Sequence, residues 1–113
     1  MLPKTNRLTQ DADFKRINSR SRPVFTDGLR LKYLPNTLGQ SRFAFVISTK
    51  VSKKSTIRNR LKRQLREIIR LNKLKIKSGF DLVISTNTKA LGRDYKELED
   101  EVAWLLDKAK LLK

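Results

Sequence analysis

The sequence predicts a single α+β domain in which helices pack on a small sheet, and three observations support this fold class. The chain has 113 residues, enough for one modest core but too few for two domains of about 100 to 200 residues. Apolar residues make up 38% of the chain, so a folded core is expected despite the high charge. Helix-like and strand-like segments follow one another in the order α-β-β-α-β-α. We therefore expect residues 1–113 to form one domain.

The N-terminal part of the chain predicts an arm followed by a short helix. Residues 1–8 are expected to form an extended basic arm. Thr9 can cap a helix that runs to Asn18, because a threonine hydroxyl accepts hydrogen bonds from the free N–H groups of a first turn. Phe14 and Ile17 are the apolar positions of this helix, so it should pack through one short apolar side.

Three segments have the character of strands. Residues 24–34 are interrupted at Asp27-Gly28. Beyond this break, apolar side chains alternate with mainly cationic ones. Such alternation places one row of side chains toward a core and the other toward solvent or a ligand. Residues 43–48 and 80–86 are almost continuously apolar, which indicates that both strands lie centrally in the sheet.

Residues 93–111 predict a C-terminal helix with an apolar stripe and an acidic face, and Asp94 can help at its N-terminus. Trp104 lies away from the stripe, and we expect a partly exposed ring packed on a neighbouring loop, with an RNA or protein contact as the alternative. The acids of residues 99–101 favour a solvated face over a metal site, because consecutive helical residues point in different directions. The stripe consists of Tyr95, Leu98, Val102, Leu105, Leu106 and Ala109.

The charge of the chain indicates a polyanionic partner. Lys and Arg total 27 against 11 Asp and Glu, which gives a net charge of +16 and a sequence pI near 10.7. Because like charges repel one another in a compact state, so large an excess is costly without a counter-charge. Nucleic acid and an anionic membrane surface are the candidates.

Missing residue types exclude several function classes. The chain has no Cys and no His, which excludes disulfides, thiolate or imidazole metal ligands, and Ser-His or Cys-His nucleophiles. Self-contained catalysis is therefore not expected, and we assign no catalytic residue and no metal ligand. No apolar run approaches the roughly 18 residues of a membrane span, and residues 1–7 lack the apolar region of a signal peptide. We expect a soluble protein of the cytoplasm.

The central helix is the candidate for the interaction with a polyanion. Ser55 or Thr56 is a plausible N-cap for a helix that runs to Asn72. At about 3.6 residues per turn, its apolar residues fall on one side and its cations on the other, with Asn59 in the middle of the cationic side. The apolar side consists of Ile57, Leu61, Leu65, Ile68 and Ile69.

The cations of this helix have few compensating acids. Arg58, Lys62 and Arg66 are spaced four residues apart, and like charges at that spacing destabilise an isolated helix. Glu67 is the one acid in the segment, so a merely solvated face explains the pattern less well than phosphate contact does. Guanidinium groups match phosphate oxygens with planar forks, and Asn59 can both donate and accept hydrogen bonds at a 2′-hydroxyl, a phosphate or a base edge.

Several stretches of the sequence show a resemblance to a known protein family. The strongest is Arg58-Asn59-Arg60-Leu61-Lys62-Arg63-Gln64-Leu65-Arg66-Glu67, which follows a basic strand exit at Ser48-Thr49-Lys50. Weaker ones are Arg7-Leu8 with Asp13-Phe14, Leu29-Arg30-Leu31-Lys32-Tyr33, and Phe80-Asp81-Leu82-Val83-Ile84. In these stretches and in the order of its elements, the chain resembles the protein subunit of bacterial ribonuclease P, which with a catalytic RNA trims the 5′ leader from precursor tRNA. The resemblance covers almost the whole chain.

The resemblance implies an α/β sandwich with a small mixed sheet, the fold of the second domain of the fifth small-subunit ribosomal protein. Its crossover through the basic helix is expected to be left-handed, against the usual right-handed rule. Two RNA surfaces are also implied. The first faces the ribozyme RNA, helps to support metal ions near the cleavage site, and corresponds to Lys53, Lys54, Arg58, Asn59, Arg60, Lys62, Arg63 and Arg66. The second is a cleft between the first helix and the sheet that holds the single-stranded leader, and it corresponds to Phe14, Asn18, Arg30 and Lys32.

The leader cleft departs from the family pattern. Asn18 and Lys32 occupy positions that are often aromatic in the family, so base stacking is expected to be reduced and phosphate attraction raised. Phe14 fits the core and the cleft equally well. The resemblance places it in the cleft, whereas a lone aromatic on a short amphipathic helix usually packs against the core. For Tyr33, which lies in the row of Leu29 and Leu31, a core position is favoured.

The function expected from these features is that of an RNA-binding cofactor in a ribonucleoprotein endonuclease. Mg²⁺ would be held mainly by the RNA, with none bound by the protein alone, and the RNA would direct water onto the phosphodiester. The partners would be ribonuclease P RNA and precursor tRNA, with the protein monomeric in the absence of RNA and not bound to membranes. The alternative is a basic ribosomal or general RNA-binding protein without a role in catalysis. A membrane-surface protein is disfavoured, because the apolar side of the basic helix has no Trp or Phe.

Overall fold

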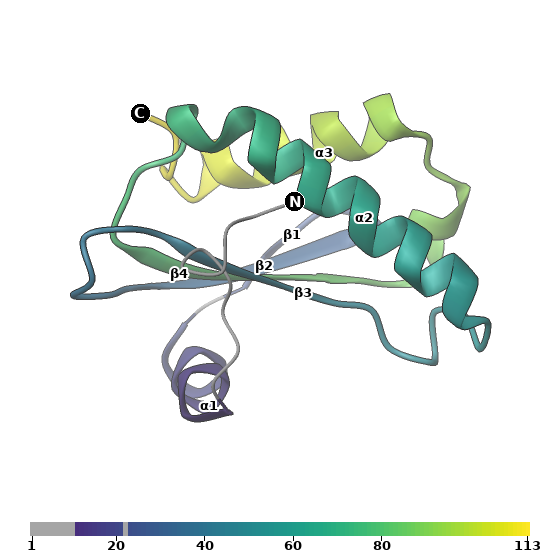
Figure 1. The fold of residues 1–113 in the computed structure, drawn as a ribbon, viewed down its shortest axis with the longest axis horizontal. Helices are drawn as coiled ribbons and strands as arrows, with labels where there is room; N and C mark the ends of the chain where they lie inside the picture. The colour runs from purple at the N-terminus through teal and green to yellow at the C-terminus, as the bar shows by residue number, and fades with distance from the viewer. Residues whose placement is uncertain (1–10, 22) are drawn as a thin grey trace.

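The computed structural model describes residues 11–21 and 23–113, and it has a four-stranded sheet with helices on both faces (Figure 1). The predicted α+β fold class is confirmed. The predicted arm of residues 1–8 and the predicted cap Thr9 lie outside the described residues. The elements in chain order are α1 (Asp11–Arg20), β1 (Val24–Phe25), β2 (Leu29–Pro35), β3 (Arg42–Val46), α2 (Ser55–Asn72), the 3₁₀ helix η2 (Lys73–Lys75), β4 (Phe80–Thr86), the 3₁₀ helix η3 (Thr88–Gly92) and α3 (Tyr95–Lys108).

The sheet is mixed, with the strand order β1-β2-β4-β3. β4 is central and pairs with β2 antiparallel and with β3 parallel. The predicted break at Asp27-Gly28 is present, and it separates the two-residue strand β1 from β2. α2 connects the parallel strands β3 and β4, and in Figure 1 this crossover has the left-handed sense that the resemblance implies.

The prediction that both apolar strands are central was right for β4 and wrong for β3, which lies at the edge of the sheet. β3 is apolar because helices cover both of its faces. Phe43 and Phe45 belong to the main core, whereas Ala44 belongs to the smaller cluster on the opposite face. A strand buried on two faces has the same apolar pattern at an edge as at the centre.

The helices form two layers of unequal thickness around the sheet. α2 and α3 cover one face and α1 covers the other (Figure 1). Leu61, Leu65, Ile68 and Ile69 of α2 are buried in the main core, so most of the predicted apolar side is confirmed, and Ile57 at the start of the helix is half-buried. The core beneath α1 is small, and its buried members are Ile17, Ala44 and Val83.

The helix termini differ in part from prediction. α2 ends at Asn72 as predicted, but its N-cap is Lys54 rather than Ser55 or Thr56, and no side chain caps it. α1 runs two residues further than predicted, to Arg20. α3 is shorter than predicted at both ends: the capping box of Asp94 and Glu97 fixes its start at Tyr95, and it ends at Lys108 rather than Leu111.

Candidate nucleic-acid interface

The outer side of α2 is a cationic surface, hereafter the α2 face. Asn59, Arg60 and Arg63 are exposed there. Lys62 and Arg66 are half-buried, because their aliphatic stems lie along the helix surface. A shallow depression of about 440 Å³ lies on this face and is lined by Thr56, Asn59, Lys62, Arg63 and Arg66. The structure therefore brings four of the predicted ribozyme-contacting residues around one depression, with Asn59 among the cations.

The remaining predicted residues of this group lie at the start of the helix. Lys53 and Lys54 are exposed. Arg58 is half-buried, and its Nη1 donates a hydrogen bond to the backbone oxygen of Ser52 at 2.8 Å. Arg58 therefore also holds the loop before α2 against the helix, a structural role that the sequence did not indicate.

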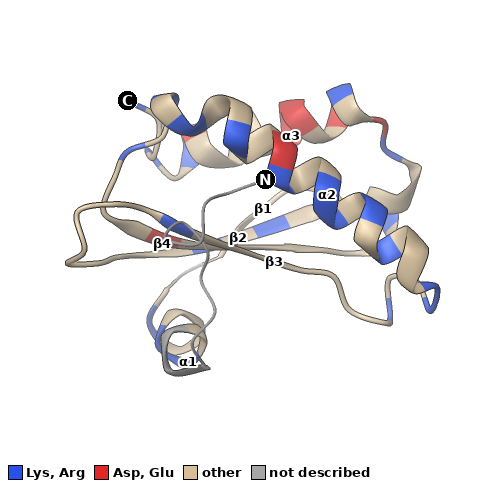
Figure 2. Cartoon of the chain, in the orientation of Figure 1, with Lys and Arg blue, Asp and Glu red and all other residues tan. Residues whose placement is uncertain are grey.

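Acidic residues do not neutralise the α2 face. Glu67 forms its ion pair with Arg70, three residues along the helix, and the hydrogen bond from Arg70 lowers the pKa of the Glu67 carboxyl. Within the described part of the chain, the predicted cations of α2 form no ion pair with an acid. Figure 2 shows Lys and Arg repeated along α2, whereas red residues gather on α3. This separation leaves the positive potential of α2 available to a polyanion.

The predicted leader cleft is only partly assembled. The Nζ of Lys32 donates to the Oδ1 of Asn18 at 3.3 Å, which joins β2 to α1. Phe14 is half-buried and packs against the small cluster around Ile17, which supports its core position. Arg30 is exposed two residues before Lys32 in β2, and it lines a pocket at the end of the sheet together with Phe25 and Ser85.

Tyr33 lies on the opposite face of the sheet. It packs against the main core, and its ring meets that of Phe80 edge to face with the centroids 6.4 Å apart. The expected core position is therefore confirmed.

Asp81 is the residue that the sequence analysis overlooked on the α1 side. This carboxylate is fully buried and accepts two hydrogen bonds from Arg42, one from Arg16 of α1 and one from Asn36. Burial by itself raises the pKa of Asp81, but the hydrogen bonds from Arg42 and Asn36 and the charges of Arg42 and Arg16 outweigh it, so the pKa lies below its usual range. Its signal in the sequence was a lone acid inside an otherwise apolar strand.

The acids near the start of α3 divide into two roles. Glu99 and Asp100 pair with Lys96 at the surface, as expected of a solvated face. Glu101 instead turns inward and accepts hydrogen bonds from the hydroxyl of Thr26 at 2.6 Å and from Arg93 at 3.1 Å. The expectation was therefore wrong for Glu101, which ties α3 to the loop after β1. In the described residues, no group of three or more acids is placed to hold a metal ion.

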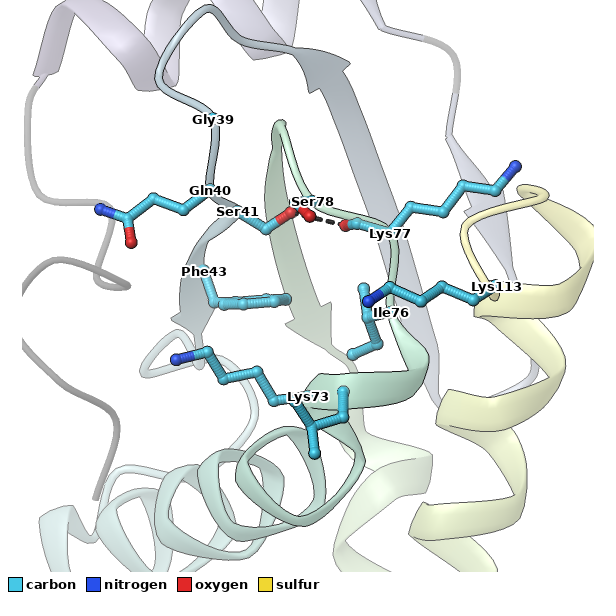
Figure 3. Close-up of a pocket in the computed structure, with 10 residues that line it drawn as sticks. Gly39, Gln40, Ser41, Phe43, Lys73, Ile76, Lys77, Ser78 and Lys113 are labelled. Carbon is cyan, nitrogen blue, oxygen red and sulfur yellow. Dashed lines mark hydrogen bonds between the residues drawn. The ribbon is translucent and has the colours of Figure 1, made fainter.

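Two further features lie outside the predicted surfaces. Trp104 is 47% exposed, as the expected partial exposure requires, and Lys108 of the same helix lies over its ring with Nζ 5.6 Å from the centroid. A pocket of about 170 Å³ next to η2 has Phe43 and Ile76 in its wall and three lysines around it (Figure 3). These lysines are Lys73, Lys77 and Lys113. None of the described helices is long and apolar enough to cross a membrane.

Comparison with known proteins gives a consistent family. Residues 2–110 match the family model described as Ribonuclease P. The ribonuclease P protein component of a Pseudanabaena species is 38% identical over 113 residues, which cover 99% of this chain and 97% of that protein. The ribonuclease P protein component of a Synechocystis species is 37% identical over 112 residues, which cover 98% of this chain and 90% of that protein.

Solved structures agree with the sequence matches. The ribonuclease P protein from Thermotoga maritima is 30% identical and superposes with a TM-score of 0.82, covering 90% of this chain and 96% of that one. The Staphylococcus aureus ribonuclease P protein superposes with a TM-score of 0.87 over 97% of this chain and all of that one, and at 22% identity it supports the fold alone.

Proposed function

Because this chain belongs to the ribonuclease P protein family, we propose that it is the protein subunit of a ribonucleoprotein endonuclease that removes the 5′ leader from precursor tRNA. In this proposal the α2 face binds the catalytic RNA, and the sheet face beside α1 binds the leader. The protein supplies positioning and positive charge, whereas the RNA holds Mg²⁺ and performs the hydrolysis. It works in the cytoplasm and is monomeric without RNA.

The observation that carries the proposal is the uncompensated charge of the α2 face. Lys62, Arg63 and Arg66 surround Asn59 on a helix whose one acid is already paired with Arg70. The helix is held by its buried opposite side, so these side chains are presented on a rigid support. Binding to a phosphate backbone is most favourable for cations that have no acidic partner to give up. Each phosphate contact also releases a condensed counterion, which favours binding further.

The roles proposed for individual residues follow from their positions. Lys53, Lys54, Arg58, Asn59, Arg60, Lys62, Arg63 and Arg66 contact the catalytic RNA. Phe14, Asn18, Arg30 and Lys32 border the path of the leader. Since Lys32 and Asn18 are joined by a hydrogen bond, they act as one polar contact to the leader backbone.

Reconstitution with ribonuclease P RNA tests the proposal. Adding the protein should stimulate 5′ processing of a precursor tRNA at low Mg²⁺, and binding to the RNA should weaken by about 10³-fold between about 50 and 200 mM salt if roughly six phosphates are contacted. RNA binding without stimulation would favour a general RNA-binding protein. Binding that hardly responds to salt would contradict the electrostatic role of the α2 face.

A further inference from the structure

The pocket of about 170 Å³ next to η2, hereafter the η2 pocket, is held together by three segments that are far apart in the sequence (Figure 3). The N–H of Lys77 donates to the backbone oxygen of Leu111 at 2.7 Å. The N–H of Lys113 donates to the backbone oxygen of Lys75 at 2.8 Å. From the loop between β2 and β3, the hydroxyl of Ser41 donates to the backbone oxygen of Lys77 at 2.8 Å. Its walls are therefore fixed by hydrogen bonds of the fold and are formed before any ligand binds.

The interior of the η2 pocket is apolar and has room for one side chain. Phe43, Leu74 and Ile76 are among the residues that line it. Since a cavity of about 150 Å³ is enough for a benzene ring, one Phe or Leu side chain would fill this pocket. Leu74 is 86% exposed, the highest value among the large apolar residues of the described chain. Because Leu74 borders an apolar pocket and does not stand alone on the surface, its exposure indicates a site for an apolar group.

The charges around the η2 pocket are positive. Lys73, Lys77 and Lys113 line it, and no Asp or Glu does. In Figure 3 the side chain of Lys113 extends from the C-terminal segment toward Phe43 and Ile76. Lys113 forms no ion pair with an acid in the described part of the chain. An apolar pocket with a cationic rim is complementary to a ligand that has an apolar group next to an anionic one.

An acidic protein segment matches this combination better than RNA does. The hydroxyl of Ser41, a buried polar group of the wall, already donates to one backbone oxygen and accepts from the N–H of Phe80 at 3.2 Å. A base in the pocket would therefore place its polar edge against Phe43 and Leu74 without hydrogen-bond partners, which is unfavourable. Residues 1–10 of the chain itself match the rim poorly, because they include Lys and Arg but no acid.

We propose that the η2 pocket docks an acidic segment of a partner protein, with one apolar side chain of that segment against Phe43 and Leu74 and a neighbouring carboxylate on Lys113. The site is separate from both proposed RNA surfaces. Leu74 follows Arg66, the last residue that lines the depression of the α2 face, by about two helical turns, or roughly 12 Å. Phe43 belongs to the main core, on the side of the sheet opposite α1. The inference does not depend on the proposed function.

Titration of the full-length protein with a short, labelled peptide tests the site. The peptide is rich in Asp and carries one central Phe. Because any acidic peptide is attracted to a chain of net charge +16, the matched control peptide has Ser in place of Phe. The Phe peptide should bind at least about tenfold more tightly, the contribution of one buried anchor residue. Equal affinity of the two peptides, or no binding of either, overturns the proposal.

Substitutions in the protein locate the bound peptide. Leu74→Asp adds a carboxylate to the pocket wall and should weaken binding of the Phe peptide by at least about tenfold, with an unchanged melting temperature because Leu74 is exposed. Lys113→Glu should also weaken it. Lys89→Glu is the matched control, because Lys89 is exposed in η3, beyond the other end of β4, and undergoes the same change of charge. Equal losses in Lys113→Glu and Lys89→Glu would reveal general charge attraction and no specific site.

The same variant distinguishes other occupants of the η2 pocket. Leu74→Asp should bind a labelled oligouridylate, and stimulate precursor processing by ribonuclease P RNA, as the wild type does. A loss of either would assign the pocket to RNA and contradict the proposal. In sedimentation, the wild type alone should be a monomer. A wild-type dimer that Leu74→Asp dissociates would assign the pocket to a second copy of the chain, and the proposed partner would be excluded.

Discussion

The two cationic surfaces of this molecule differ in what holds them in place. The α2 face stands on an 18-residue helix whose opposite side buries four large aliphatic residues in the main core. The α1 face, the sheet surface beside α1 that carries Arg30 and Lys32, rests on a small cluster around Ile17 and on the buried carboxylate of Asp81, which joins Arg16 of α1 to the sheet. Both surfaces carry cations, but their structural support differs. Binding and folding should therefore be separable by substitution on the α2 face and coupled on the α1 face.

The largest effect is expected from a charged substitution on the buried side of α2, compared with a substitution on its exposed side. Leu61→Asp places a carboxylate in the main core and should cost more than about 4 kcal/mol, which is most of the roughly 5 kcal/mol that stabilises a domain at the low end of the usual range, so folding should be largely lost. Arg60→Ala, one residue away and exposed, should leave the melting temperature unchanged. Circular dichroism during heating measures both, and equal loss of folding would show that the exposed arginines of α2 are structural.

Asp81→Asn should have the second largest effect and should act on both properties. The change removes the buried counter-charge shared by Arg42 and Arg16 and is expected to cost about 2–4 kcal/mol, with leader binding weakened because α1 loses one of its ties to the sheet. Asp100→Asn removes an exposed carboxylate and should change neither. Urea unfolding and precursor binding are the measurements, and full stability in Asp81→Asn would contradict the coupling proposed for the α1 face.

Arg63→Ala should have a smaller and purely functional effect. Loss of one charge-assisted contact should weaken binding of the catalytic RNA by about tenfold, or ~1.4 kcal/mol, and reduce the dependence of log affinity on log salt by about one phosphate. Arg58→Ala should combine weaker binding with a looser loop, because Arg58 also bonds to the backbone of Ser52. Filter binding at several salt concentrations separates the two variants, and an unchanged slope in Arg63→Ala would remove this residue from the RNA interface.

Acid should weaken the support of the α1 face. The folded-state pKa of Asp81 lies below the unfolded value of about 3.9, so its stabilising contribution is complete above that value and is lost as the pH falls through the folded pKa. The difference in free energy of unfolding between the wild type and Asp81→Asn should therefore shrink in acid and stay constant near neutrality. A constant difference down to strongly acidic pH would exclude this linkage.

The sequence was sufficient for the features that depend on local periodicity. The apolar side of α2 and the residue range of β4 follow from the local pattern alone, and Asp94 caps α3 because its partner Glu97 is three residues away. The edge position of β3 could not be read in the same way. Strand order is decided by pairing between distant segments, and a strand covered on both faces looks central wherever it lies.

The contacts that shape the candidate site were harder to predict because their partners are far apart in the chain. Arg16 and Asp81 are 65 residues apart, and Thr26 and Glu101 are 75 apart. The family resemblance supplied the α2 residues as a group, but it could not show that Arg58 also holds the loop before the helix.

The crossover through α2 gives the assembly of the ribonucleoprotein a thermodynamic consequence. α2 lies between β3 and β4 in the chain, so its cations take their places only when these strands pair. RNA that binds the α2 face is therefore a ligand of the native state. At a concentration of about 100 Kd it should raise the free energy of unfolding by about 2.7 kcal/mol. In a chain of net charge +16, like charges repel one another in the compact state. By neutralising these charges, the partner RNA contributes to the stability of the folded protein.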